Sequence, residues 1–145
     1  MKICLVTEEN FEDAAAVYAA SWKESHKAVC SPAFLESRDC RGFLRREREA
    51  GKAIYLLTDK EPCGIVSVAG DCIENLYVLP RLQNRGYGTR LLRFAAGLCQ
   101  RPYLTALSSN DRAIALYRRL GFRETGEKKR LRADLWELIL EKNND

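Results

Sequence analysis

The chain has 145 residues, of which 46% are hydrophobic and 30% are charged, and it carries a formal net charge of +4. This length is typical of one domain, and the composition argues against a disordered, collagen-like or fibrous protein. No apolar run approaches the ~20 residues that a bilayer span requires, and the opening MKICLVTEENFED becomes acidic too early for a signal peptide. We therefore expect residues 1–145 to form a single domain in the cytoplasm, with no membrane partner.

The six cysteines lie far apart, with no C-x-x-C pair, and His26 is the single histidine. Zinc sites use closely spaced cysteine and histidine ligands, so we expect no metal. Cys72 and Cys99 lie inside apolar stretches, as expected of small buried thiols in a reducing compartment. We interpret the cysteines as residues that fill the core.

The first part of the chain predicts one strand followed by three helices. The opening KICLV is a strand, and the apolar spacing of residues 7–28 predicts a long helix. Ser31 is a suitable N-cap for a short second helix that has Pro32 in its first turn. A third, charged helix over residues 39–51 is expected to end at its last glycine.

The remainder predicts a sheet and two more helices. Three extended runs, 53–59, 64–70 and 72–78, are separated by turn residues and predict antiparallel hairpins. The later elements are expected to be a helix over 88–100, a strand over 103–108, a helix over 110–121, and closing strands over 122–130 and 134–142. The expected fold class is α/β (α+β), with a mixed, mostly antiparallel central sheet flanked by helices. Large apolar residues in the last strand suggest an exposed sheet edge, which would allow a homodimer.

The segment QNRGYGTRLL joins the third extended run to the next helix. A helix N-terminus has unpaired N–H groups and a partial positive charge, and glycine lets a backbone approach a ligand closely. Gly86 and Gly88 would therefore turn the N–H groups of residues 84–89 toward a phosphate or pyrophosphate. Arg85 and Arg90 would add positive charge.

The G-x-G tripeptide alone is a weak signal, and an ordinary tight turn is the alternative. No G-K-[ST] follows it, so it is not a Walker loop. Leu91 stands near the place of the third glycine of a dinucleotide fingerprint, which excludes that motif as well.

The wider segments carry a more specific pattern. LYVLPRLQNRGYGTRLL resembles the acetyl-CoA-binding signature Q/R-x-x-G-x-G/A of the GNAT N-acetyltransferase family, with Gln83, Gly86 and Gly88 at its defined positions. NDRAIALYRRLGF, residues 110–122, resembles the helix that follows in the same family. The resemblance covers residues 73–122 and is looser over the first helix. It implies a GNAT-like acyl-CoA N-acyltransferase fold, with acetyl-CoA as cosubstrate. It also implies transfer of the acetyl group to a primary amine of a small molecule or peptide by direct attack.

The resemblance further implies where acetyl-CoA binds. The pyrophosphate would lie on the N–H groups of residues 84–89, and the pantetheine arm would pair like an extra strand with the backbone of residues 76–78. Asn110 would cap its helix and contact the cofactor arm. The implied cofactor-binding residues are Leu76, Tyr77, Val78, Gln83, Asn84, Arg85, Gly86, Tyr87, Gly88, Thr89 and Asn110.

Two residues are candidates for the chemistry. An amine that attacks a thioester must lose a proton, and the leaving thiolate must gain one. Tyr117 stands where the GNAT family usually has the tyrosine that protonates the thiolate, although a core tyrosine is the alternative. Glu74 should share a face with Leu76 and Val78, because strand side chains alternate.

The role of Glu74 has three alternatives. It is a candidate general base that acts through a water, it could pair with a neighbouring arginine, or it could contact the cation of the amine. The glutamate of the family often stands nearer the position of Cys72, which leaves the identity of the base open.

The acceptor side carries fewer signals. His26 lies near the end of the first helix beside Trp22, and both are candidates for contact with the substrate. A surface histidine, or one with all its hydrogen bonds made inside the protein, is the alternative. The sequence does not distinguish a cationic small molecule from a peptide N-terminus or a lysine.

Two other functions are alternatives. A CoA-binding sensor or interaction module with little turnover would keep the same loop. The cationic runs LRRERE, YRRLGFR and EKKRLR suggest solvated helix faces, a phosphate-bearing ligand or a nucleic acid. They lack interleaved aromatic residues and a base-reading motif, so we expect no nucleic-acid partner.

Overall fold

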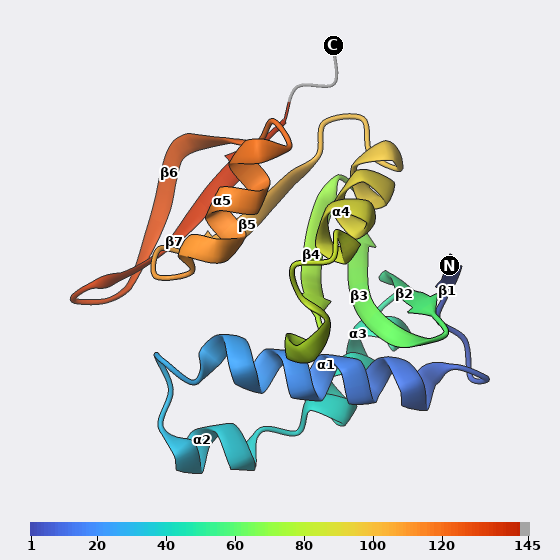
Figure 1. Cartoon of the computed structure of the whole chain (residues 1–145). Coiled ribbons are helices and arrows are strands. Elements are labelled where there is room, and N and C mark those ends of the chain that lie inside the picture. The colour runs from blue at the N-terminus through green and yellow to red at the C-terminus, as the bar shows by residue number, and fades with distance from the viewer. Residues whose placement is uncertain (143–145) are drawn as a thin grey trace.

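A computed structural model describes residues 1–142 and shows a seven-stranded sheet flanked by helices (Figure 1). The strand order is β1-β2-β3-β4-β5-β7-β6, and the neighbours are antiparallel except for β4 and β5. The strands are β1 (Lys2–Leu5), β2 (Ala53–Asp59), β3 (Glu61–Ala69), β4 (Cys72–Val78), β5 (Tyr103–Leu107), β6 (Arg123–Arg132) and β7 (Leu135–Glu141). The helices are α1 (Phe11–His26), α2 (Pro32–Ser37), α3 (Cys40–Glu49), α4 (Tyr87–Gly97), α5 (Asp111–Arg119) and a short 3-10 helix, η1 (Pro80–Leu82). The expected fold class is confirmed, while residues 143–145, the end of the expected domain, lie outside the described residues.

Two apolar cores lie on opposite faces of the sheet. In one core, Leu92 of α4 packs with Val66 of β3. In the other, Tyr18 of α1 and Leu44 of α3 pack with Ile65 of β3. Because side chains alternate along a strand, the consecutive residues Ile65 and Val66 enter different cores. The central strand β3 is therefore apolar on both of its faces.

Local signals account for the helix starts. The Ser31 hydroxyl accepts a hydrogen bond from the Phe34 N–H at 3.2 Å, which confirms the N-cap of α2. The Asn110 side chain accepts one from the Ala113 N–H at 3.2 Å, which confirms the N-cap of α5.

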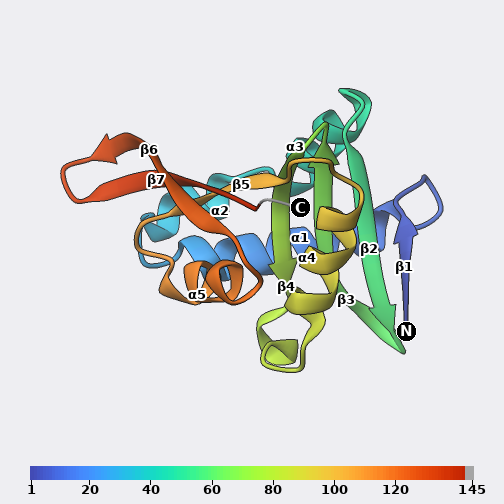
Figure 2. The same ribbon diagram turned by 90° about the horizontal axis from the view of Figure 1, so that it is seen from above.

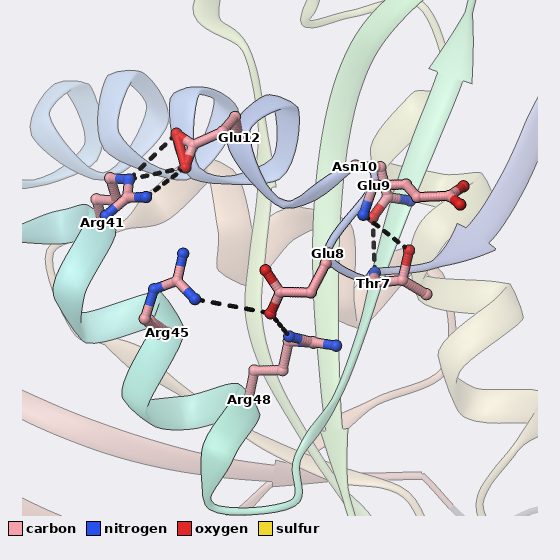
Figure 3. Close-up of polar contacts among 8 residues, drawn as sticks. All are labelled: Thr7, Glu8, Glu9, Asn10, Glu12, Arg41, Arg45 and Arg48. Carbon is pink, nitrogen blue, oxygen red and sulfur yellow. Dashed lines mark hydrogen bonds and ion pairs between the residues drawn. The ribbon is translucent and has the colours of Figure 1, made fainter.

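Ion pairs join α3 to the start of α1 (Figure 3). The Arg41 Nη2 lies 2.6 Å from Glu12 Oε1, and the Arg48 Nη1 lies 2.6 Å from Glu8 Oε1. The Arg45 guanidinium lies 4.3 Å from the ring centroid of Phe11. Arg45 and Arg48 of the LRRERE run therefore have partners within the chain, and exposed pairs of this kind add little stability.

Two sequence expectations about strands are wrong. The run expected over 64–70 begins earlier, at Glu61, because Asp59 pairs directly with Glu61 and Lys60 turns the chain at φ 68°. The last strand, β7, lies between β5 and β6 and is not an edge. The edge is β6, whose many charged side chains are exposed and discourage pairing with another chain. The structural reason for expecting a homodimer through the last strand therefore does not hold.

The cysteines only partly match their interpretation as core residues. Cys40, Cys63 and Cys99 are buried, whereas Cys4, Cys30 and Cys72 are partly exposed. Their apolar neighbours in sequence did not distinguish the two groups, because burial depends on contacts with distant elements.

Within residues 1–142, none of the helices combines the length and the apolar character needed to cross a membrane.

Candidate active site

A cleft opens where β4 and β5 separate. The two parallel strands pair at only two positions, Cys72 with Tyr103 and Ile73 with Leu104. Figure 2 shows β5 turning away from β4 beyond this point. The cleft has a volume of about 950 Å³ and is lined by residues from α1, α3, β4, β5, α4 and α5. After Ile73, β4 has no strand partner on the β5 side within residues 1–142, so its backbone groups there are open to a ligand.

A β-bulge changes the faces of β4. The register shifts between Ile65 and Ser67 of β3, which pair with Tyr77 and Glu74 respectively. Paired residues share a face, and Ile65 and Ser67 are two residues apart, so Glu74 and Tyr77 lie on the same face. The expectation that Glu74 shares its face with Leu76 and Val78 is therefore wrong, because the bulge adds one residue to β4.

The loop before α4 has the conformation that its glycine favours. Gly86 is the N-cap residue of α4 and has a φ of 86°, while Asn84 has a φ of 67°. Both values lie in the left-handed region, which glycine adopts at little cost. The Gln83 Nε2 donates a hydrogen bond to the Val78 carbonyl at 3.2 Å and ties the loop to β4. The first N–H groups of α4 have no acceptor within the helix and are available to an anion.

Tyr117 is buried on α5, with 7% of its surface exposed, and its side chain borders the cleft. Burial raises the pKa of its phenol above the ordinary value, with a smaller contribution from Tyr77. Within residues 1–142 the Tyr117 hydroxyl has no hydrogen-bond partner. The phenol therefore stays protonated at neutral pH and is available as a proton donor.

Glu74 is bound in an ion pair on the face that it shares with Tyr77. The Lys52 ammonium lies 2.8 Å from Glu74 Oε2 and 2.8 Å from Glu47 Oε1. These hydrogen bonds, first to Glu47 and then to Glu74, raise the pKa of Lys52. The alternative that Glu74 pairs with a neighbouring arginine is right about an ion pair and wrong about the partner, which is Lys52.

Cys72 stands at the start of β4, beside this ion pair. Burial, followed by the charge of Glu74, raises the pKa of its thiol to about 11. The thiol is therefore protonated at neutral pH, and Cys72 is neither a base nor a nucleophile there.

His26 lies at the end of α1 and borders the cleft. Its ring stacks on Trp22 with a centroid distance of 4.2 Å. The His26 Nδ1 lies 2.9 Å from the Trp22 carbonyl and 2.8 Å from the Ser25 hydroxyl. Trp22 is buried, and its ring packs against the ring of His26. Of the two expected substrate residues, only His26 lines the cleft.

Comparison with known proteins places this architecture in a family. A family model described as an acetyltransferase (GNAT) domain matches residues 49–124, which is more than half of the chain. The chain belongs to the GNAT acetyltransferase family.

The individual relatives match this GNAT chain over only part of its length. N-alpha-acetyltransferase RimI of Mycobacterium tuberculosis is 42% identical over 62 residues, which are 40% of this chain and 38% of RimI. Peptidyl-lysine N-acetyltransferase YjaB of Salmonella typhimurium is 27% identical over 78 residues, 54% of each chain. The chain thus spans about half or less of the length of these two relatives.

A solved structure supports the GNAT fold over the whole chain. PaiA N-acetyltransferase of Thermoplasma acidophilum, in complex with coenzyme A, has a TM-score of 0.75. The alignment covers 99% of both chains at 20% identity. At this low identity, the structural similarity shows that the two proteins share a fold.

Most of the cofactor residues expected from the GNAT signature meet at the cleft. Three do not line it. Arg85 lines a separate, smaller cavity with Asp59 and Glu61. Gly86 and Gly88 present no side chain, and a Cβ at Gly88 would lie 3.3 Å from Leu116 Cδ2, so this glycine allows α4 to approach α5. The expected residues that line the cleft are Leu76, Tyr77, Val78, Gln83, Asn84, Tyr87, Thr89 and Asn110.

Two cationic residues that contact Asn84 and Thr89 in the cleft were missed by the sequence analysis. The Arg112 Nη2 donates a hydrogen bond to Asn84 Oδ1 at 3.0 Å, and the Arg119 Nη2 donates one to Thr89 Oγ1 at 3.4 Å. Both arginines line the cleft. They are two helical turns apart and therefore share one face of α5. This spacing in the sequence was the signal that could have identified them as a pair. Glu47 and Lys52 were also missed, because they lie outside the GNAT signature.

Proposed function

We propose that this GNAT protein transfers the acetyl group of acetyl-CoA to a primary amine by direct attack. The observation that carries the proposal is the open backbone edge of β4, which lies in a cleft that is also lined by Glu74, by the N-terminal turn of α4 and by Tyr117. An extended pantetheine arm suits such an edge, since its amide groups would pair with the backbone of residues 76–78. A pyrophosphate suits the N–H groups of residues 84–89. The PaiA structure is a complex with coenzyme A, which supports the same cofactor.

Cations from α5 complete the phosphate end of the site. Arg112 and Arg119 reach the loop through Asn84 and Thr89, and we assign them to the phosphates of acetyl-CoA. Arg85 has its own acidic neighbours, and it is not part of this assignment.

Tyr117 is assigned the role of general acid. The sulfur that leaves the acetyl group carries negative charge, and the protonated phenol would donate its hydrogen to it. A backbone N–H within residues 76–78 would polarise the acetyl carbonyl. The Cys72 thiol is neutral and therefore a poor nucleophile, so the proposed reaction has no acetyl-cysteine intermediate.

The acceptor is proposed to be positively charged. Glu47 and Glu74 both line the cleft, and together they hold one ammonium group, that of Lys52. A further carboxylate, Glu24, lines the cleft from α1. The names of RimI and YjaB refer to α-amines and to peptidyl-lysine, so peptide amines are the first acceptors to test, together with polyamines.

We also propose that the chain acts as one domain, residues 1–145, in the cytoplasm. The buried thiols of Cys40 and Cys63 suit a reducing compartment.

The first test is a mass-spectrometric transfer assay. Acetyl-CoA would be incubated with spermidine, an N-terminally blocked lysine peptide and a peptide with a free N-terminus. We expect an acetylated product from at least one of them, and a rate about 100-fold lower for Tyr117→Phe, because general acid catalysis of this kind contributes at least that factor.

Tyr55→Phe is the matched control for this assay. Tyr55 packs against Phe94 outside the cleft, so loss of its hydroxyl should leave the rate unchanged. An equal rate in Tyr117→Phe would contradict the acid assignment. Binding of acetyl-CoA without any transfer would favour a sensor over an enzyme.

A further inference from the structure

The hydrogen bonds of His26 determine which of its nitrogens carries the proton. A carbonyl oxygen can only accept a hydrogen bond, so the contact of 2.9 Å between the Trp22 carbonyl and Nδ1 requires a proton on Nδ1. The Ser25 hydroxyl donates to the same carbonyl at 3.0 Å, which leaves its oxygen free to accept from Nδ1. In the neutral imidazole, Nε2 is therefore the unprotonated nitrogen.

This nitrogen makes no contact that would hold it within the described part of the chain. Within residues 1–142, Nε2 of His26 has no hydrogen-bond partner, and the residue lines the cleft together with Tyr117 and the open edge of β4. The ring is held by stacking on Trp22, so its orientation does not depend on a ligand. A fixed imidazole with an open basic nitrogen is the arrangement that proton abstraction requires.

We propose that Nε2 of His26 is the base that takes a proton from the acceptor amine. This inference rests on the proposed acetyl transfer. Glu74, the candidate base from the sequence, is held by the Lys52 ammonium at 2.8 Å, so one of its carboxylate oxygens is already engaged in an ion pair. Among residues 1–142, His26 makes no ion pair, and its ring contacts only the Ser25 hydroxyl and the Trp22 carbonyl through hydrogen bonds.

The surroundings suit a base at neutral pH. Burial lowers the pKa of His26 below its ordinary value, the field of Arg38 lowers it further, and the Trp22 carbonyl opposes both effects. The other titratable groups at this end of the cleft are Glu24 from α1, Glu47 from α3, and Cys72, Glu74 and Tyr77 from β4, with the Lys52 ammonium between Glu47 and Glu74.

The position of His26 also suits the protonated form that catalysis creates. His26 is the last residue of α1, where the carbonyl ends of the helix favour a positive charge.

The protons balance in this scheme. An ammonium acceptor has three protons on its nitrogen, and the amide product keeps one. His26 takes one proton through Nε2 and releases it to water. The last proton restores the phenol of Tyr117 after that phenol has protonated the sulfur of CoA. The N–C bond forms as the C–S bond breaks, so the products are the amide, free CoA and one proton.

The first test uses the fact that His26 is the single histidine. Two-bond ¹H–¹⁵N spectra of the ¹⁵N-labelled chain report its tautomer and its titration directly. We expect the Nδ1–H tautomer and a pKa below the ordinary ~6.5 of histidine. An Nε2–H tautomer would overturn the proposal whatever the acceptor is.

The second test compares kcat between pH 5 and 9 at saturating acetyl-CoA and acceptor, with the fastest acceptor of the panel above. In the wild type, kcat should fall below the pKa of His26, since the protonated imidazole cannot accept a proton. His26→Gln should lose about 100-fold in kcat at pH 7 together with this acidic limb, whereas Glu74→Gln should keep the limb.

Two further variants separate chemistry from folding. His26→Asn keeps an N–H that can donate to the Trp22 carbonyl, and it should bind acetyl-CoA like the wild type but show the same loss of kcat. Imidazole added to His26→Ala should restore part of the rate, which a purely structural role would not allow. A limb that persists in His26→Gln and disappears in Glu74→Gln would instead make Glu74 the base. A wild type that acetylates no amine would overturn the proposed function and this inference together.

Discussion

The two ends of the cleft are built by different kinds of interaction. The end that faces the proposed cofactor comes from one continuous segment, β4 to α5, and its shape depends on backbone geometry: a bulge, a left-handed N-cap and an open strand edge. The end that faces the proposed acceptor is made of side chains from α1, α3, the connection before β2 and the start of β4. There Lys52 bridges Glu47 to Glu74, and His26 stacks on Trp22.

This difference has a consequence for specificity. The family match, residues 49–124, contains the cofactor end, whereas His26 and Glu47 precede it. Backbone geometry tolerates many side chains, so a cofactor site of this kind is shared easily among GNAT proteins. The acceptor end depends on individual side chains from distant elements and is where we expect this chain to differ from its relatives.

The largest expected effect concerns the packing that holds α4, and so the cofactor end, in place. Leu92 is fully buried, whereas Leu98, after the same helix, is 51% exposed. Leu92→Ala should lower the free energy of unfolding by about 2–5 kcal/mol, because it removes buried methyl groups and leaves a cavity. Leu98→Ala is the control and should change it by less than about 0.5 kcal/mol. Urea titration measures both, and equal effects would show that α4 is not anchored by this face.

A smaller effect should separate the two ends directly. Arg112→Ala removes a cation beside Asn84, and we expect the KM for acetyl-CoA to rise about 10-fold while the KM for the acceptor stays the same. Arg93→Ala, on the exposed side of α4, loses the same charge away from the cleft and should change neither constant. An equal rise in both KM values would contradict the division of the cleft into two ends.

The smallest expected effect tests the backbone of the cofactor loop. Gly86→Ala places a side chain at a φ of 86° and should lower the free energy of unfolding by about 1 kcal/mol. Gly97→Ala, within α4 and with open space around it, should instead stabilise the chain by about 0.5–1 kcal/mol. Thermal unfolding with and without acetyl-CoA compares the two. The ligand should protect Gly86→Ala less than the wild type, and equal protection would argue against this loop as the pyrophosphate site.

Short-range signals in the sequence were sufficient for much of the fold and for the conformation of the loop before α4. The bounds of β2 and β4 agree with the extended runs, and Ser31 and Asn110 cap the expected helices. A cap or a left-handed turn involves only a few consecutive residues, so the residue types there are enough to predict it. The glycine at the start of α4 belongs to the same class of signal.

Features that depend on contacts between distant segments required the tertiary structure. The bulge opposite Val66 moved Glu74 to the face of Tyr77, and no period-two rule anticipates an inserted residue. The pairing of β7 with β5 and β6 removed an expected edge. Lys52, in the connection before β2, joined Glu47 of α3 to Glu74 of β4. The exposure of His26 to the cleft also depends on the tertiary structure, because the cleft forms only when α1 packs beside β4. Strand register and side-chain contacts across the sheet are set by the packing of the whole domain, so the residues that we assign to the acceptor became visible only there.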